Sequence, residues 1–481
     1  MAEKHEPTLL HSLIPIIFLI ILLSFNVFIF GDDALSGSNQ IVLILSAAVA
    51  AVVASQIGFE WQELREGVVK SISSAMTSML ILLMIGSLAG TWLLSGIVPA
   101  MIYYGLQILS PGIFLFAACV VCSVVSVATG SSWTTSATVG IALIGIGTAL
   151  GIPVGWVAGA ILSGAYFGDK LSPLSDTTNL APAMAGTDLF THIRYMALTT
   201  VPSITIALII FLIAGFTMDT SATAIPTDEI LTAISTKFKV TGWLFIVPVV
   251  VVVLIVRKVP ALPALLAGTL LGAVFALIFQ PGIVAEIGGG SGTEGLYIGV
   301  MKSLYGDIAI TTSNDMVNDL LSSGGMKGML GTVWLIISAM IFGGIMEKAG
   351  FLKCIAASVL SLVRSAGSLV ASTAATCVFF NITASDQYLA IVVPGRMYAD
   401  IYEKKGLAPE NLSRTLEDSG TVTSVLVPWN TCGAYHSKVL GVSTGDYYMY
   451  CFFNLISPLM TILFAYAGIK IKKLTTKQVV A

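Results

Sequence analysis

Long apolar segments recur along the whole chain, and they constrain its fold more than any other feature of the sequence. Examples are LIPIIFLIILLSFNVFIF, MLILLMIGSLAGTWLL, YMALTTVPSITIALIIFLIAGF and ALLAGTLLGAVFALIF. Inside a bilayer, only helices and closed barrels satisfy every backbone polar group, and a helix needs about 20 apolar residues to cross. Only 10% of the 481 residues are charged, against about 25% in a typical soluble domain. The sequence therefore predicts an all-α polytopic membrane protein with about 12–14 transmembrane segments.

The distribution of Lys and Arg predicts which loops face the cytoplasm, because positively charged short loops are retained there. The basic connections lie at 257–258, 396–414 and 470–477, and the acidic ones at 31–39 and 218–230. We therefore expect a multi-pass protein of the cytoplasmic (inner) membrane with both termini in the cytoplasm. The first apolar segment is expected to be a retained span, since no small-residue cleavage site follows it. The net charge of −3 disfavours a nucleic-acid partner.

Two stretches of the chain resemble each other in a way that predicts an internal repeat. Aligning GTWLLSGIV (90–98) with GIMEKAGFL (344–352) and extending without a gap places Thr129 on Thr383. The same alignment places Ser131 on Ser385 and Ser132 on Asp386. By our count, an odd number of crossings separates the copies, so the second copy enters the membrane in the opposite orientation. Secondary transporters built in this way bind their substrate near the midplane, where broken helices of the two copies meet.

The repeat divides the chain into five expected parts. We assign residues 1–70 to N-terminal transmembrane helices, 71–215 to a first inverted repeat, and 216–328 to connecting helices with an extracytoplasmic loop. Residues 329–470 are assigned to a second inverted repeat, and 471–481 to a cytoplasmic tail.

Each copy contains two polar interruptions in otherwise apolar helices. They are TGSSWTTSAT and GDKLSPLSDTTN in the first copy, and NITASDQ and DSGTVTSVLVPWNT in the second. Gly130, Pro173, Gly420 and Pro428 weaken helix continuity at these places. Irregular backbone at membrane depth is tolerated only where protein or a water-lined cavity surrounds it. Four such breaks would form an oxygen-rich chamber at the midplane.

The chemistry of these breaks suits a small cation. Hydroxyl, carbonyl and carboxylate oxygens are the ligands that hard cations prefer. Five acids lie at the breaks: Asp169, Asp176, Asp386, Glu417 and Asp418. An aspartate near the bilayer centre costs about 2.5–3.5 kcal/mol on insertion scales, so its presence indicates a function. A buried carboxyl group can hold either a proton or a cation, and competition for one site is a simple way to couple antiport.

Several residues have a second interpretation. Lys170 either pairs with Asp169 or Asp176 or extends to the cytoplasmic surface, and Glu417 could lie at the water interface. Any one hydroxyl could simply satisfy a carbonyl group of its own helix. The two aspartates also raise the alternative of an intramembrane aspartyl protease, but Pro173 between them disfavours a shared helical face. A channel is a further alternative, although the chain contains no ring-forming filter sequence. We expect no enzyme activity and no cofactor, only transported Na⁺ and H⁺.

The stretch GDKLSPLSDTTNLAPAMAGTDLFTHIRYM (168–196) resembles the signature region of the NhaC family of Na⁺/H⁺ antiporters, and DSGTVTSVLVPWNTCGAY (418–435) resembles its second signature. The resemblance covers practically the whole chain. It implies two inverted repeats with broken helices around the site, and a homodimer with a scaffold and a moving transport domain. It also implies a set of ion- and substrate-binding residues, of which Asp169 and Asp176 would hold Na⁺: Ser131, Ser132, Thr134, Asp169, Ser172, Asp176, Thr177, Thr178, Asn179, Asn381, Thr383, Ser385, Asp386, Asp418, Thr421, Thr423, Asn430 and Thr431.

One departure from the family pattern follows the second signature. Small or apolar residues are expected there, whereas this chain has His436, Ser437 and Lys438. A histidine beside a cation path would add pH sensitivity, and Lys438 would attract an anionic substrate. Together with Lys170, these two residues are the possible modulators of the site.

The sequence therefore leads to one main hypothesis and one alternative. The main hypothesis is a secondary transporter that exchanges Na⁺ for H⁺ by alternating access. The alternative is a Na⁺- and H⁺-coupled exchanger of small carboxylates of the malate and lactate type. The expected partners are membrane lipid, Na⁺, H⁺, a second copy of the chain and, in the alternative, the carboxylate.

Overall fold

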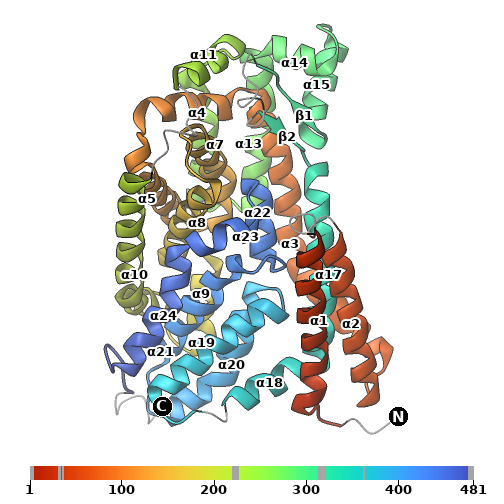
Figure 1. Cartoon of the computed structure of the whole chain (residues 1–481), viewed down its shortest axis with the longest axis vertical. Helices are drawn as coiled ribbons and strands as arrows, with labels where there is room; N and C mark the ends of the chain where they lie inside the picture. Colours follow the sequence, from red (N-terminus) through yellow and green to blue (C-terminus); the bar gives the residue numbers. More distant parts are fainter. Residues whose placement is uncertain are drawn as a thin grey trace.

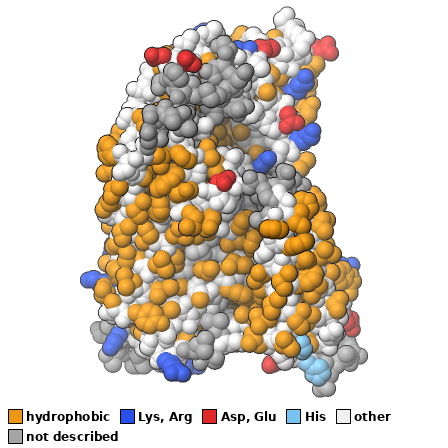
Figure 2. Space-filling model, viewed as in Figure 1, with side chains coloured by type: hydrophobic (Ala, Val, Ile, Leu, Met, Phe, Trp, Pro, Cys, Tyr) orange, Lys and Arg blue, Asp and Glu red, His pale blue; other side chains and the backbone are white. Residues whose placement is uncertain are grey.

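The computed structural model is dominated by helices and describes residues 5–30, 34, 37–218, 227–312, 318, 321–360 and 363–474. Among these residues, eight helices are long and apolar enough to cross a membrane, and two bent helix pairs raise the number to ten. The remaining crossings of the predicted set of about 12–14 would have to come from broken helices. Apolar side chains cover the middle of the surface in Figure 2, and most charged side chains lie towards its two ends.

One part of the molecule is a bundle of long helices, which we call the scaffold bundle. It consists of α1 (Leu9–Phe30), α2 (Ser38–Gln56), α3 (Trp61–Leu94), α13 (Ala261–Phe279) and α17 (Leu330–Lys348). Helix α3 packs along both α13 and α17. Glycines allow α3 and α17 to approach closely, because a Cβ atom on Gly67 would lie only 2.6 Å from the Cβ of Lys348. Close contacts of this kind drive helix association in membranes.

Most of the remaining helices form two copies of one pattern: a helical hairpin followed by a broken helix. The first copy contains α5 (Pro111–Thr129), α6 (Ser132–Thr135), a π-helical turn (Ser136–Gly140), α7 (Ile141–Ala149), α8 (Val154–Leu171) and α9 (Asp176–Ala185). The second contains α19 (Ala366–Thr383), α20 (Gln387–Lys404), α21 (Pro409–Leu416), a π-helical turn (Glu417–Thr421), a 3₁₀ turn (Ser424–Leu426) and α22 (Thr431–Leu440). Corresponding helices begin 255 positions apart, as Val154 and Pro409 illustrate.

The helix caps at the hairpin tips follow the same spacing and correct the sequence alignment. Ser131 caps α6 and Asp386 caps α20, each accepting a hydrogen bond from the backbone N–H three residues later, at 3.1 Å and 3.0 Å. Directly before them, Gly130 and Ser385 adopt left-handed conformations with φ of 70° and 59°. Ser131 therefore corresponds to Asp386, not to Ser385. The ungapped alignment was wrong here because the second copy has one additional residue between the start of α18 (Phe351–Leu360) and the start of α19.

The second breaks also correspond, and the copies occupy opposite ends of the molecule. Ser175 caps α9 and Asn430 caps α22, with Pro173 and Pro428 two residues before them. In Figure 1, α4 (Ile97–Ile108) and α7 lie near the upper end, whereas α18 and α20 lie near the lower end. This is the placement expected of corresponding helices when the two copies have opposite orientations in the membrane.

The copies are completed by α10 (Leu189–Thr217) in the first, and by α23 (Thr444–Tyr447) and α24 (Phe452–Tyr466) in the second. Between them come α11 (Thr227–Lys237), α12 (Ile246–Val256), α13, α14 (Pro281–Gly288), α15 (Thr293–Tyr305) and the antiparallel strands β1 (Ile308–Ala309) and β2 (Ser322–Ser323). Region 216–328, predicted as connecting helices with a loop, thus includes the long apolar helix α13.

The first and last long helices place both described chain ends on one side. Helix α1 begins and α24 ends at the lower end of Figure 1. Parts of the predicted outer loops, at 31–33, 35–36 and 219–226, lie outside the described residues, as does the predicted tail from 475 onwards.

Candidate ion-binding site

The carboxylate of Asp169 lies where the first hairpin tip meets the break between α8 and α9. Its Oδ2 atom accepts hydrogen bonds from the backbone N–H of Ser132 at 3.0 Å and from the Ser132 hydroxyl at 2.7 Å. The side chain of Ser172, within the break, donates to the carbonyl oxygen of Val127 at 2.8 Å. The Asp169 residue is only 7% exposed. The tip and the break are thus tied together around a buried acid.

The first turn of α9 completes this arrangement. The Thr178 hydroxyl donates to the carbonyl oxygens of Asp169 and Lys170, at 3.3 Å and 3.1 Å, which the end of α8 leaves without their helical partners. Asn179, by contrast, is exposed and donates to the carbonyl groups of Pro173 and Ser175 within its own loop.

A fully buried ion pair joins the two copies. Lys170 at the end of α8 pairs with Asp418 in the π-helical turn after α21, and both side chains are completely shielded from solvent. Lys170 therefore neither pairs with Asp169 or Asp176 nor extends to the surface. Three hydroxyls also donate to the Asp418 carboxylate: those of Thr199 at 2.7 Å, Ser457 at 3.2 Å and Thr461.

Glu417 lies beside this pair and is buried, not at the water interface. Its Oε1 atom accepts a hydrogen bond from the Thr177 hydroxyl of α9 at 2.9 Å. Its Oε2 atom has no hydrogen-bond partner among the described residues. A buried carboxylate oxygen without a partner is costly unless a proton or a cation accompanies it.

The breaks of the second copy are held together mainly by amide side chains. Asn381 donates to the carbonyl oxygen of Gly420 at 2.7 Å and to the Thr423 hydroxyl at 2.9 Å. Asn430 in turn donates to the Asn381 carbonyl oxygen at 3.0 Å, and the Thr431 N–H donates to the Ser385 carbonyl oxygen at 2.9 Å. These contacts join the tip of the second hairpin to the break before α22.

Some predicted site residues belong neither to the group around Asp169 nor to the group that joins the breaks of the second copy. Asp176, predicted to hold Na⁺ together with Asp169, is exposed and does not share the buried environment of Asp169. The break ends one residue before it, which leaves Asp176 in the first turn of α9 on the outer face. The Thr383 hydroxyl donates to a carbonyl oxygen of its own helix, as many membrane hydroxyls do. Lys438 is exposed as well.

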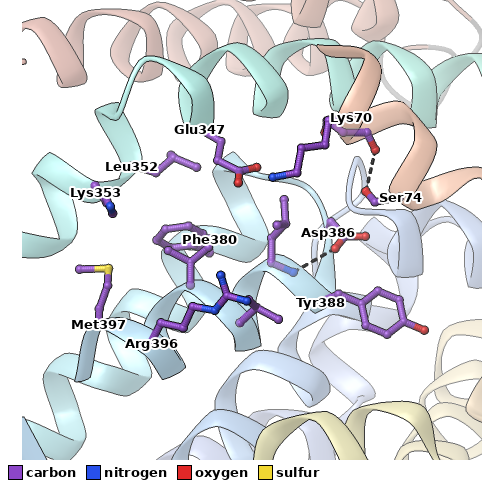
Figure 3. Close-up of a pocket in the computed structure, with 14 residues that line it drawn as sticks. Lys70, Ser74, Glu347, Leu352, Lys353, Phe380, Asp386, Tyr388, Arg396 and Met397 are labelled. Carbon is purple, nitrogen blue, oxygen red and sulfur yellow. Dashed lines mark hydrogen bonds between the residues drawn. The ribbon is translucent and has the colours of Figure 1, made fainter. Parts of the chain in front are cut away.

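Asp386 faces a separate cavity of about 660 Å³ between the scaffold bundle and the second hairpin. Figure 3 shows Lys70 and Glu347 pointing towards one another from α3 and α17, while Arg396 reaches into the cavity from α20. The Asp386 side chain is only 3% exposed because it caps α20. Predicted as a ligand beside Asp169, this acid instead lines the boundary between two packed parts of the molecule.

His436, predicted as a possible modulator, is fully buried within an aromatic group. The ring centroids of Tyr435, Tyr166 and Trp133 lie 5.0, 5.5 and 6.2 Å from that of the histidine. Neither ring nitrogen has a hydrogen-bond partner among the described residues. His436, which belongs to α22, thus packs against α8 and the first hairpin tip.

Sequence reasoning missed the residues that surround Asp418. Thr199 lies in α10, and Ser457 and Thr461 lie in α24, both apolar helices outside the four breaks. The signal that could have found them is the group of hydroxyl residues inside each apolar span: Thr199, Thr200 and Ser203 in α10, and Ser457 and Thr461 in α24. The described residues contain no group of three or more His, Cys, Asp or Glu side chains arranged to hold a metal ion.

Comparison with known proteins supports the resemblance seen in the signatures. The family model described as "Na+/H+ antiporter family" matches residues 164–469. The Na⁺/H⁺ antiporter NhaC of Alkalihalophilus pseudofirmus is 37% identical over 90% of this chain and 91% of its own length. The malate-2H⁺/Na⁺-lactate antiporter of Bacillus subtilis is 37% identical, covering 97% and 96%. The arginine/ornithine antiporter ArcD of Halobacterium salinarum is 34% identical, covering 97% and 93%. The two signatures and these matches together show that the chain belongs to the Na⁺/H⁺ antiporter family.

Proposed function

We propose that this protein exchanges Na⁺ for H⁺ by alternating access and that the Asp169 carboxylate holds each cation in turn. The observation that carries this proposal is the burial of Asp169 between the first hairpin tip and the α8–α9 break, where Ser132 orients it. A carboxylate in such a place needs a proton or a cation to balance its charge. Because both compete for the same oxygens, binding of one releases the other.

The remaining predicted ligands keep different roles in this proposal. The hydroxyls, amides and carbonyl groups at the breaks would complete the coordination of Na⁺ as the ion passes. Asp176 would attract cations from the aqueous side, since it is exposed beside the break. Asp418 would support the site through Lys170, because one ammonium group and three hydroxyls already occupy its carboxylate.

The two copies would act as inverted repeats that move against the scaffold bundle. The cavity lined by Asp386 and Arg396 supports this view, since it lies at the boundary where the second hairpin would slide past α3 and α17. We infer a homodimer from the family resemblance. We also place the protein in the inner membrane with both termini in the cytoplasm, because basic loops are retained on that side. In this proposal the protein is a carrier without a catalytic residue or cofactor.

Reconstitution into liposomes with an internal pH-sensitive dye tests this function. Na⁺, Li⁺, K⁺, malate and lactate are added in turn to wild-type proteoliposomes and to protein-free liposomes. We expect Na⁺ without an added organic acid to drive proton movement in the opposite direction. A dye signal that requires an organic acid in addition to Na⁺ would contradict simple Na⁺/H⁺ exchange.

That contradictory result would favour carboxylate exchange, the second candidate. Two observations support carboxylate exchange as the second candidate. One is the 37% identity to an antiporter named for malate and lactate. The other is the presence of Lys353 and Arg396 at the cavity beside the second hairpin, where they could attract an anion.

A further inference from the structure

The proposed function uses one buried carboxylate, but the centre of the molecule contains a second one that no partner neutralises. Glu417 is completely buried in the π-helical turn that follows α21. Only its Oε1 atom has a hydrogen bond, from Thr177. In the same turn, the buried Thr421 hydroxyl also has no hydrogen-bond partner among the described residues. With the buried Ser419 hydroxyl, three oxygens without a hydrogen-bond partner among the described residues therefore lie in this short segment, in a place where unpaired polar atoms are rare.

Hydroxyl groups connect Glu417 to Asp169. The Thr177 hydroxyl that donates to Glu417 lies 3.2 Å from the Ser175 hydroxyl. The Ser175 hydroxyl in turn accepts a hydrogen bond from the Thr178 N–H at 3.4 Å, and the Thr178 hydroxyl donates to the carbonyl oxygen of Asp169 at 3.3 Å. Asp169 belongs to the first copy and Glu417 to the second, so the two acids form one polar network across the copies.

The charges of this network do not balance. Among the described residues, it contains Asp169, Glu417 and Asp418 against the cation Lys170, while the buried Arg414, one turn before Glu417, lies over the Tyr195 ring and forms no ion pair with a described acid. Lys170 lies on the Asp418 carboxylate, so neither Asp169 nor Glu417 has an ion-pair partner among the described residues. Leaving two unpaired carboxylates in a low-dielectric interior costs far more than a folded protein can sustain. Each of these two carboxyl groups therefore needs either a proton or a bound cation.

We propose that Glu417 is a second cation-binding carboxylate and that the site holds two monovalent cations at once, one at Asp169 and one at Glu417. This inference rests on the proposed function, because it assumes that Asp169 takes the first cation. The Glu417 Oε2 atom and the Thr421 hydroxyl supply oxygen ligands of the kind that Na⁺ prefers. Thr177 positions the carboxylate by holding its other oxygen.

Counting bound ions tests the proposal directly. Radiolabelled Na⁺ binding to the purified protein is measured to saturation at alkaline pH, where protons compete least. We expect two Na⁺ per chain in the wild type and one in Glu417→Gln. Asp169→Asn should also bind one. Glu417→Asp, which keeps the charge on a shorter side chain, should retain two ions with a several-fold weaker affinity for one of them.

Glu410→Gln is the matched control, since Glu410 is a buried acid in the same helical segment but is paired with Lys472. It should bind two ions. An equal number of ions in the wild type and in Glu417→Gln, with both proteins monodisperse on size exclusion, would overturn the proposal. Na⁺-driven proton movement in wild-type liposomes is measured in parallel. Its absence would refute the proposed function, whereas its presence together with an unchanged ion count would refute only the role of Glu417.

Discussion

The two copies begin their helices at corresponding residues, yet they place different chemistry on that shared backbone. At the end of α8, the first copy has Asp169 and Lys170. The corresponding positions of the second copy, 255 residues later, are Ser424 and Val425 in the 3₁₀ turn. Ser424 is buried like Asp169, and its hydroxyl donates to the Gln387 amide oxygen at 3.3 Å. The second copy thus keeps a polar contact between its broken helix and its hairpin but has no charge at this position.

The second copy instead carries its acids about two turns earlier. Glu417 and Asp418 occupy positions where the first copy has Leu162 and Ser163. The π-helical turn there widens the helix, a feature that often marks functional sites. Neither copy alone contains a balanced set of charges, since Lys170 comes from the first and its partner from the second. The comparison teaches that the two patterns share the positions of their breaks but not the charged residues near them.

The largest expected effect comes from removing the acid of the first copy. Asp169→Asn should reduce Na⁺-driven proton movement to the level of protein-free liposomes, because the neutral amide cannot exchange a proton for a cation. Ser424→Ala, at the corresponding position, should retain most of the activity, since it removes only the uncharged contacts of the hydroxyl with Thr421, Gln387 and Tyr166. Initial dye-response rates at matched protein density provide the measurement. Equal losses in both variants would show that the two breaks contribute alike.

The next effect concerns the ion pair that joins the copies. Lys170→Met and Asp418→Asn should each lower the free energy of unfolding by about 3–5 kcal/mol, because each leaves one buried charge unpaired. The double variant should be less destabilised than the sum of the two, since it leaves neither charge. Thermal unfolding of the four proteins in one detergent gives the comparison. Additive losses would mean that the pair contributes nothing as a pair.

Much of the backbone pattern could be predicted from the sequence, because breaks have local causes. Pro173 and Pro428 cannot continue a helix, and Ser131 and Asp386 are residue types that favour N-caps. These signals also located Asp169, because its acidic side chain directly precedes a break. The alignment of the copies was wrong by one residue at the hairpin tips, since the additional residue of the second copy produces no composition signal.

The directions of side chains were harder to predict, because each break reorients the helix that follows. Asp176 has the same chemistry as Asp169, yet it begins a new helix and is exposed. The sequence placed Glu417 at a break but left open whether it lies at the water interface. In the structure, helices distant in the chain bury it. Thr199 and Thr461 approach Asp418 through tertiary packing alone. Helical periodicity does not contain that information.

A smaller effect is expected at the left-handed residue of the first hairpin tip. A Cβ atom at Gly130 would lie 2.6 Å from the Cβ of Leu174, in addition to the cost of φ at +70°. Gly130→Ala should therefore destabilise the protein by more than the roughly 1–2 kcal/mol of the conformation alone. Gly186→Ala is the control, since Gly186 has φ of +82° and a Cβ atom added there would have no neighbouring atom within 4 Å. Equal melting temperatures for the two variants would show that the tip can move away from Leu174.

The smallest effect, and the one of opposite sign, is expected at the corresponding residue of the second tip. Ser385 has φ of 59° and a buried hydroxyl without a hydrogen-bond partner among the described residues. Ser385→Gly should stabilise the protein by up to about 1 kcal/mol, because glycine adopts this conformation without the steric cost. Ser385→Ala removes the same hydroxyl but keeps the strained Cβ, so it should not raise the melting temperature. If the hydroxyl is a Na⁺ ligand, both variants should raise the KM for Na⁺ by a similar factor while differing in stability. A KM change in only one of the two Ser385 variants would assign the effect to the backbone conformation. The second tip would then differ from the first in conformation but not in ion binding.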